Sequence, residues 1–342
     1  ARALAKASHE SVPYVRDYFS EFGRQFLVME LIEGPDLAEM LERRQSPFPL
    51  EDVLNWLDQL LDALDYLHTL QPPLIHRDIK PQNLKLTSRG KIKLLDFGIS
   101  KTVDAANTVT NQTFVGATIN YSPIEQILPA ITQTFREFII LKHERQAQHV
   151  LSQNTDARCD IYAAGATLYH LMTGRPPVDA AKRTLEMWEG GRDPLLNPSE
   201  LNPVIPPAIS AFLLKAMEVD RERRYPSAVE MRKALHAVVN EEIRRKKEAA
   251  AAALRRAAEQ ERLRMSATEQ NQRRLDPIAP PPIPLPSTPP PVPAKTEPLV
   301  TGDEFAETIR DISAHIQHLP TEQFQMPAIP PPAPTSTTLT EP

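Results

Sequence analysis

Apolar and polar positions divide the chain into a first part of about 240 residues with regular hydrophobic patterns and a later part that lacks them. Two largely apolar segments, 12–19 (VPYVRDYF) and 24–34 (RQFLVMELIEG), predict two strands that end at Gly34. Segments 83–87 (NLKLT) and 91–97 (KIKLLDF) predict two further short strands. All of the predicted strands therefore lie near the start of the chain.

Apolar residues at helical spacing dominate the rest of this first part. The longest such segment is 49–70 (PLEDVLNWLDQLLDALDYLHTL). Segments 160–174, 208–219 and 226–239 have the same type of spacing and also predict helices. The fold class predicted from these patterns is α+β, mainly helical with a few short strands.

The chain after residue 240 has a different composition. Residues 241–275 combine strong helix formers and many Lys and Arg with few large apolar residues, which predicts a charged, basic helix in solvent. Residues 276–298 are rich in proline and predict an extended linker. In the tail, 299–342, a helix-capping pattern precedes four apolar residues on one helical face, so this segment is either disordered or a short amphipathic docking helix; those residues are Phe305, Ile309, Ile312 and Ile316.

Composition narrows the class of protein. The 342 residues have a formal net charge of −5 and are 41% hydrophobic, which predicts a folded core and no general attraction to nucleic acid. The one cysteine, Cys159, cannot form a disulfide within the chain and is expected to be a packed small side chain. No apolar run reaches the roughly 18–20 residues that span a bilayer, so we expect a cytoplasmic protein with no transmembrane segment in this chain.

Four motifs carry the candidate chemistry. They are HRDIKPQN (76–83), DFG (96–98), YSPIE (121–125) and DRERRYPSA (220–228). Their order and spacing resemble the eukaryotic-type protein kinases, and GATLYHLMTGRPP (165–177) resembles the bacterial serine/threonine kinases in particular. The resemblance covers residues 1–240 and implies a partial protein-kinase-like domain: the end of helix C, the hinge and the mainly helical large lobe, with a remnant of the small β lobe.

Phosphoryl transfer requires an aligned hydroxyl, metal-bridged phosphates and charge stabilisation. The resemblance implies that Asp78 accepts or orients the proton of the attacking hydroxyl and that Lys80 reaches the transferring phosphate. Thr118 takes the place beside the catalytic aspartate that marks the serine/threonine branch. Asn83 and Asp96 are the implied ligands of Mg²⁺, which prefers oxygen donors. The implied cofactors are ATP and Mg²⁺.

The same resemblance makes FLVMELIEG (26–34) the hinge that binds the adenine ring. Met29 is then the gatekeeping side chain, and the backbone groups of Glu30 and Ile32 bond the base. Leu84 and Lys85 follow the metal-binding asparagine and lie near the adenine. Lys85 replaces an apolar residue that usually lies under the ring, although its aliphatic stem is able to cover it.

Other residues have implied structural or regulatory roles. Asp160 is expected to be a buried carboxylate that bonds the catalytic-loop backbone, and Glu125 is expected to form an ion pair with Arg224. Arg77 is either a solvated charge or the group that binds a phosphate on the activation segment. The candidate acceptors of that phosphate are Thr108, Thr110 and Thr113.

The chain also departs from the family pattern. Residues 127–153 form a long insertion, expected to be helical and amphipathic, which either gates substrates or decorates the surface. Ala117 and Ile124 replace the usual glycine and proline. No Gly-rich loop, strand lysine or helix glutamate is found in the sequence before the hinge. We therefore expect an N-terminally truncated kinase domain that is inactive as this chain alone.

Together these observations favour a serine/threonine protein kinase, whose partners are protein substrates, ATP and a partner for the proline-rich tail. A pseudokinase or docking scaffold that uses the large lobe and the tail is the alternative, and a kinase of small molecules is a third. The intact set of Asp78, Lys80, Asn83 and Asp96 weighs against a scaffold. The activation segment and the YSPIE motif weigh against a small-molecule kinase, because they shape a groove for a peptide.

Overall fold

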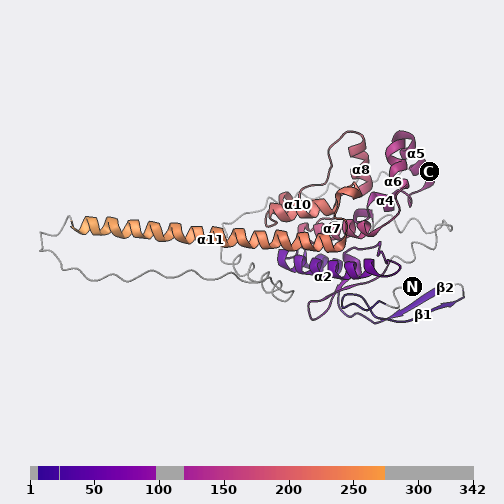
Figure 1. Cartoon of the computed structure of the whole chain (residues 1–342), viewed down its shortest axis with the longest axis horizontal. Coiled ribbons are helices and arrows are strands. Elements are labelled where there is room, and N and C mark those ends of the chain that lie inside the picture. Colours follow the sequence, from indigo (N-terminus) through magenta and orange to yellow (C-terminus); the bar gives the residue numbers. More distant parts are fainter. Residues whose placement is uncertain (1–6, 23, 98–118, 274–342) are drawn as a thin grey trace, which may run out of the picture. The chain divides into compact units, whose positions relative to one another are not determined.

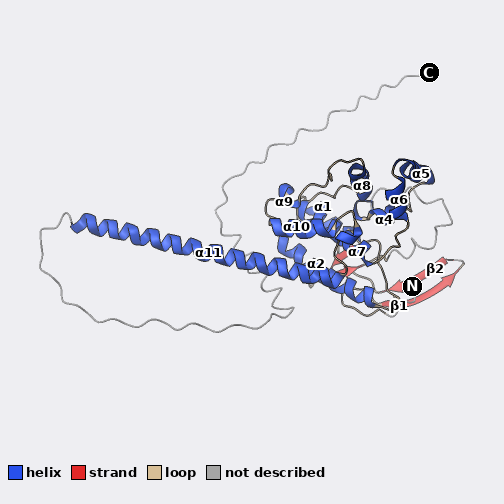
Figure 2. Cartoon of the chain, turned by 45° about the horizontal axis from the view of Figure 1, so that its top comes forward, coloured by secondary structure: helices blue, strands red, loops and turns tan. Residues whose placement is uncertain are grey.

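The computed structural model of the chain describes residues 7–22, 24–97 and 119–273 (Figure 1). The chain divides into two compact units, Ala1–Glu297 and Pro298–Pro342. All of the described residues belong to the first unit. Its described elements are mostly helices, with two pairs of short strands (Figure 2).

The first pair of strands is an antiparallel hairpin of β1 (Val15–Glu21) and β2 (Arg24–Met29). Phe19 and Phe26 lie opposite each other in the register and stack with ring centroids 5.2 Å apart. Both rings are partly exposed, so the hairpin presents an apolar face. The hairpin leads directly into the predicted hinge.

The second pair consists of β3 (Leu84–Leu86) and β4 (Ile92–Leu94), which are also antiparallel. Leu84 lies opposite Leu94 in the register, and both are buried. The turn between the strands contains Gly90 with φ 73, a conformation that glycine adopts without strain. This small sheet follows the HRDIKPQN motif and leads into DFG.

The centre of the helical region is α7 (Ala157–Thr173), most of whose residues are buried. It packs against α2 (Leu50–Thr69) and α10 (Pro207–Ala216). Gly165 allows the close approach to α10, because a Cβ there would lie 2.9 Å from Ala216 Cβ. On α2, apolar residues at three- and four-residue intervals form the buried stripe that the sequence pattern predicts; they include Val53, Leu57, Leu60, Leu61 and Leu64.

The last described helix, α11 (Ala228–Arg273), runs unbroken through the boundary expected near residue 240. The sequence contains no glycine or proline within this span, so nothing ends the helix there. Met231, Leu235 and Val239 are buried, and α11 lies along α2 in both views (Figures 1 and 2). The basic helix expected for 241–275 is therefore the continuation of the last helix of the folded region.

The insertion after the YSPIE motif forms two helices, α5 (Gln133–Lys142) and α6 (Glu144–Leu151). Ile139, Ala147 and Val150 are buried in a cluster that also includes residues of α4 (Ile124–Ile127) and α7. The insertion therefore packs one face against a core cluster that it shares with α4 and α7. Exposed apolar side chains remain on α5, namely Phe135, Phe138 and Leu141.

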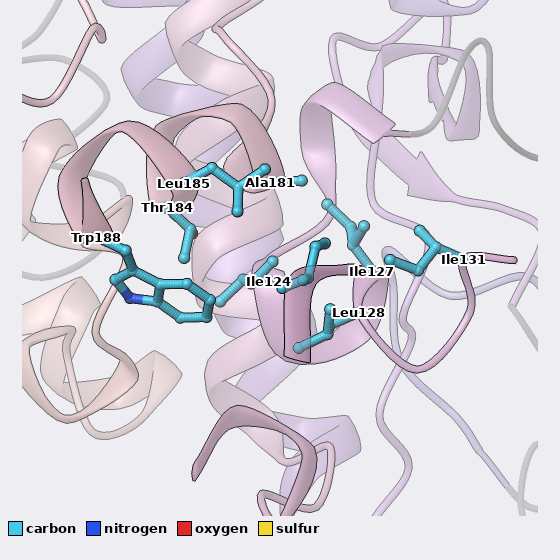
Figure 3. Close-up of a pocket in the computed structure, with 9 residues that line it drawn as sticks. Ile124, Ile127, Leu128, Ile131, Ala181, Thr184, Leu185 and Trp188 are labelled. Carbon is cyan, nitrogen blue, oxygen red and sulfur yellow. The ribbon is translucent and has the colours of Figure 1, made fainter. Parts of the chain in front are cut away.

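A small apolar pocket lies between α4 and α8 (Ala180–Trp188) (Figure 3). Trp188 and Leu185 of α8 face Ile124 and Leu128 across it. None of the expected catalytic or nucleotide-binding residues lines this pocket, although Ile124 of the YSPIE motif does. It is therefore a packing feature of the α4–α8 contact.

The remaining described elements are short. They are α1 (Leu37–Arg44), α9 (Pro198–Leu201) and the 3₁₀ turns η2 (Pro81–Asn83), η4 (Ile119–Tyr121) and η5 (Arg221–Arg223). In the part of the chain that the structure describes, no helix is both long and apolar enough to cross a membrane.

Candidate active site

The segment between α2 and β3 is fixed by a carboxylate on α7. Asp160 is fully buried, and its two oxygens accept the backbone N–H groups of His76 and Arg77, each at 2.8 Å. Nε2 of His68, near the end of α2, lies 2.8 Å from Asp160 Oδ2. The end of α2, the loop and α7 therefore meet at one carboxylate.

Asp160 is held in its charged form. Burial alone would raise the pKa of Asp160, but the hydrogen bond from His68 and that from the Arg77 backbone lower it below its usual range. A carboxylate that accepts several hydrogen bonds in a buried position is a rigid anchor for the donors around it. This buried side chain supports the loop from the interior of the fold.

Arg77 lies in a left-handed backbone conformation with φ 66, which is uncommon for residues other than glycine. Gln126 Nε2 donates to the Arg77 carbonyl at 2.6 Å, which ties the loop to α4 as well as to α7. Backbone conformations of this kind cluster at functional sites, where the surroundings fix them. Nε of Arg77 is buried without a hydrogen-bond partner among the described residues.

Three threonines expected in the activation segment and one expected catalytic threonine lie outside the described residues. They are Thr108, Thr110, Thr113 and Thr118. The structure therefore does not describe the expected phosphate acceptors or the threonine that the resemblance assigns to a place beside Asp78.

Asp78 is the centre of a compact polar set. Lys80 Nζ is 3.1 Å from Asp78 Oδ2, and both side chains are partly exposed, at 16% and 11%. Asn83 Nδ2 donates to the Asp78 backbone carbonyl at 2.7 Å and to Oδ2 at 3.0 Å. The turn η2 brings these residues together, because Asn83 N–H bonds the Lys80 carbonyl at 3.0 Å. The Lys80 ammonium and the Asn83 amide thus contact one carboxylate, that of Asp78, which solvent can reach.

Asp96 is positioned next to Asn83 by the β3–β4 sheet. The N–H of Leu95 donates to the Asn83 carbonyl at 2.8 Å, which extends the strand pairing by one step. The neighbouring Phe97 ring lies 4.6 Å from the His76 ring, and His76 Nε2 is 2.9 Å from the Leu95 carbonyl. Asp96 itself is exposed and has φ 54. The sheet therefore presents an exposed carboxylate beside the catalytic loop.

The donors at this site suit Mg²⁺. The Asn83 amide nitrogen is engaged by Asp78, so its oxygen is the atom left to accept or to coordinate. Asp96 adds a carboxylate, and Mg²⁺ is commonly bound by one or two such groups with phosphate oxygens completing its shell. No group of three or more His, Cys, Asp or Glu in the described ranges could hold a metal without such help.

The predicted hinge begins where β2 ends at Met29. The Glu30 N–H donates to the Tyr14 carbonyl at 2.9 Å, and Glu30 Oε1 accepts the Tyr14 N–H at 3.2 Å. Glu30 Oε1 also lies 2.6 Å from Lys93 Nζ on β4. This hydrogen bond from Lys93 lowers the pKa of Glu30 below its ordinary value. The Glu30 side chain therefore links the hinge to the large lobe.

Lys85 makes a second link from the small sheet to the hinge. Its Nζ donates to the Ile32 carbonyl at 3.1 Å. Leu84, which precedes it, is only 1% exposed and belongs to the core beneath the sheet. Of the two residues expected near the adenine, Lys85 is thus the one whose side chain reaches the hinge.

Glu125 and Arg224 form a buried ion pair. Arg224 Nη1 and Nη2 donate to the two Glu125 oxygens at 2.6 and 3.2 Å, and both side chains are almost completely buried. Arg224 also donates to the Glu218 and Val219 carbonyls. Cys159 Sγ lies 3.4 Å from Glu125, and burial raises the pKa of this thiol. The cysteine is a packed, unreactive side chain.

Sequence reasoning missed His68, Gln126 and Lys93. Each acts through a contact with a residue that is 92, 49 or 63 positions away, respectively. No local pattern distinguishes these three side chains from ordinary polar residues of a helix or a strand. Only the arrangement of the folded chain shows that these side chains support the loop around Asp78 and the segment that is expected to be the hinge.

Comparison with known proteins decides the family. The protein kinase domain family matches residues 1–237, which is most of the chain. The chain belongs to the protein kinase domain family. The fold class expected from the sequence, a mainly helical kinase-like α+β fold, is confirmed.

Several bacterial proteins are similar to this kinase domain. A probable serine/threonine-protein kinase of Streptomyces coelicolor is 31% identical over 245 residues, which cover 70% of this chain and 32% of that protein. The serine/threonine-protein kinase PksC of the same organism is 30% identical over 240 residues, covering 68% of this chain and 39% of PksC. The probable kinase PknB of Lactococcus lactis is 26% identical over 231 residues. The chain thus spans about a third of the length of these relatives.

Among solved structures, PpkA-294 in its apo form has the same fold. Its TM-score is 0.52 at 23% sequence identity, and the match covers 68% of this chain and 71% of that one. At this level of identity the likeness concerns the fold alone.

Proposed function

We propose that the protein transfers the γ-phosphate of ATP to serine and threonine hydroxyls of other proteins. The observation that carries this proposal is the arrangement at Asp78, where Lys80 and Asn83 contact the same solvent-accessible carboxylate. A purely structural role does not require these three groups together at an accessible position. Membership of the kinase domain family and the names of its bacterial relatives support the same activity.

In the proposed reaction, the substrate hydroxyl gives its proton to Asp78 while its oxygen attacks the γ-phosphorus. The bond between the γ-phosphorus and the bridging oxygen breaks, and ADP leaves with that electron pair. Lys80 offsets negative charge on the transferring group. Mg²⁺, held by Asn83 and Asp96, would neutralise charge on the ATP phosphates. The Glu30 and Ile32 backbone groups would bond the base, with Met29 behind it.

The serine/threonine preference rests on Lys80 and Thr118, which resemble that branch of the family. The long α11 and the proline-rich residues 276–298 are proposed to act as a tether that recruits a partner.

We also propose that a polypeptide of only these 342 residues has no turnover. Its sequence contains no Gly-rich loop, strand lysine or helix glutamate to hold the phosphates.

A scaffold without catalysis is the second candidate. The observation that favours it is Lys85, which places a cation at the hinge where the base would bind. The intact set of Asp78, Lys80, Asn83 and Asp96 argues for catalysis instead, because a scaffold has no chemical need for all four.

The test is a transfer assay with γ-labelled ATP and Mg²⁺. It uses the full-length protein, which means the whole gene product with any residues that it has beyond these 342. The substrates are a peptide mixture with serine and threonine as the only hydroxyls and a matched mixture with tyrosine only. We expect label on serine and threonine, none on tyrosine, and loss of transfer when EDTA removes the metal. Tyrosine labelling would contradict the residue preference, and an absence of transfer and of nucleotide binding would favour the scaffold.

A further inference from the structure

Two lysines of the small sheet reach the same short hinge segment. Lys85 on β3 lies directly opposite Lys93 on β4 in the antiparallel register, so both side chains project from one face of the sheet. Lys93 Nζ contacts the Glu30 carboxylate at 2.6 Å, and Lys85 Nζ contacts the Ile32 carbonyl at 3.1 Å. The hinge is therefore fastened to the large lobe at two points.

The two contacts differ in charge. Lys93 has an anionic partner, whose pKa it lowers. Lys85 bonds a neutral carbonyl, and among the described residues no carboxylate forms an ion pair with it. Lys85 is also only partly exposed. Its ammonium thus lies at the hinge with a neutral protein partner and with solvent on its remaining side.

We propose that Lys85 weakens binding of the nucleotide base, because its ammonium donates a hydrogen bond to the Ile32 carbonyl of the hinge. This inference rests on the proposed function, in which the base lies against the backbone of Glu30 and Ile32. A bound base has two ways to be accommodated. It either displaces the ammonium from the Ile32 carbonyl or covers it and removes its remaining water.

Both routes have a cost. The first breaks a hydrogen bond to a charged group, and the second desolvates a cation that has no anionic partner. The aliphatic stem of Lys85 gives apolar contact to the base in either case, and methionine retains a stem of similar length. Replacement by methionine therefore removes the ammonium while it preserves most of the apolar surface. The expected gain in affinity for the base is on the order of tenfold.

The chain offers matched controls. Lys85→Arg keeps the positive charge, and Lys85→Gln is a second neutral variant in case the methionine variant does not fold. Lys91→Met removes a lysine at the start of the neighbouring strand, where its partner is the exposed Glu10. This last variant changes the net charge by the same amount as Lys85→Met without touching the hinge.

The test is calorimetric titration of the full-length protein with adenosine and, separately, with a non-hydrolysable ATP analogue and Mg²⁺. Adenosine isolates the contribution of the base from that of the phosphates. We expect Lys85→Met and Lys85→Gln to bind both ligands about tenfold more tightly than the wild type. Lys85→Arg and Lys91→Met should bind within about twofold of the wild type.

Two results would overturn the inference, and they differ in what else they affect. In the first result, the wild type binds the two ligands, and both neutral variants bind them equally or less tightly. This result would show that the ammonium does not oppose the base, while the proposed kinase function would stand. In the second result, neither the wild type nor any variant binds either ligand. This result would contradict the existence of a nucleotide site, and with it both the proposed function and this inference.

Discussion

The Asp160 carboxylate accepts the backbone N–H of His76 at 2.8 Å, although 84 positions separate the two residues in the sequence. This contact fixes the start of the loop that contains Asp78 to α7, a helix most of whose residues are buried. The positions of Asp78 and Asn83 therefore depend on a fully buried carboxylate.

Replacement of Asp160 by Asn should destabilise the protein without a change of volume. The new amide would oppose one of the N–H donors of His76 and Arg77 with a donor of its own and would lose the charge that His68 supports. We expect a loss of about 3 kcal/mol in the free energy of unfolding, measured by urea denaturation. Glu241→Gln, at an exposed helix position, is the control and should leave the urea midpoint unchanged. Equal midpoints for the two variants would mean that Asp160 does not anchor the loop.

The Glu125–Arg224 pair should show strong coupling in a double-mutant cycle. Glu125→Leu leaves the Arg224 cation buried, and Arg224→Leu leaves the carboxylate buried, so each single change should cost about 3–5 kcal/mol of unfolding free energy. The double variant should cost clearly less than the sum, because no lone buried charge remains. Additive losses in urea denaturation would contradict the assignment of this pair as a buried, mutually dependent contact.

Stability should fall in mild acid because of His170. Burial lowers the pKa of His170 to about 4, from 6.5 in an unfolded chain, and its Nδ1 lies 2.6 Å from the Tyr121 hydroxyl. Between these two pKa values the unfolded state binds a proton that the folded state does not, so folding stability decreases as the pH falls from about 6.5 to about 4. His170→Asn should flatten this part of a plot of unfolding free energy against pH. An unchanged slope in the variant would assign the effect to other groups.

The sequence was most informative where a local pattern determines the structure. The spacing of Val53, Leu57 and Leu64 predicts α2, and short apolar segments beside turn residues predict the four strands found among the described residues. The pattern divides residues 226–275 into two helices near residue 240, whereas the structure has one helix, α11, because a change in composition is not a helix stop when no glycine or proline accompanies it.

For the candidate site, too, the sequence predicts what a local motif determines and not what the tertiary structure determines. Motif residues such as Asp78 and Asn83 could be singled out because the resemblance assigns a role to each position of HRDIKPQN. The link from Lys85 to Ile32 and the link from Lys93 to Glu30 could not, because they depend on how the β3–β4 sheet meets the hinge. Contacts of this kind depend on tertiary geometry, and one sequence holds no local signal for them.

The exposed part of α11 should be dispensable for folding and catalysis. The helix is buried only as far as Glu242, and side chains beyond it, such as Leu254, are exposed. Deletion of residues 249–342 from the full-length protein should leave the melting temperature and peptide turnover unchanged. Leu235→Ala, on the buried face of the same helix, should cost about 2–5 kcal/mol of unfolding free energy. Loss of turnover in the deletion variant would show that the tail takes part in catalysis.

The most direct test of the central claim is phosphate transfer by the full-length protein carrying Asp78→Asn, measured with γ-labelled ATP, Mg²⁺ and a serine/threonine peptide. This change removes the proposed proton acceptor while its volume is kept, and it should lower turnover by at least about 100-fold with the circular dichroism spectrum unchanged. Asp65→Asn, on α2, is the matched control and should retain wild-type turnover. Turnover by Asp78→Asn equal to that of the wild type would contradict the assignment of this loop as the site of phosphoryl transfer.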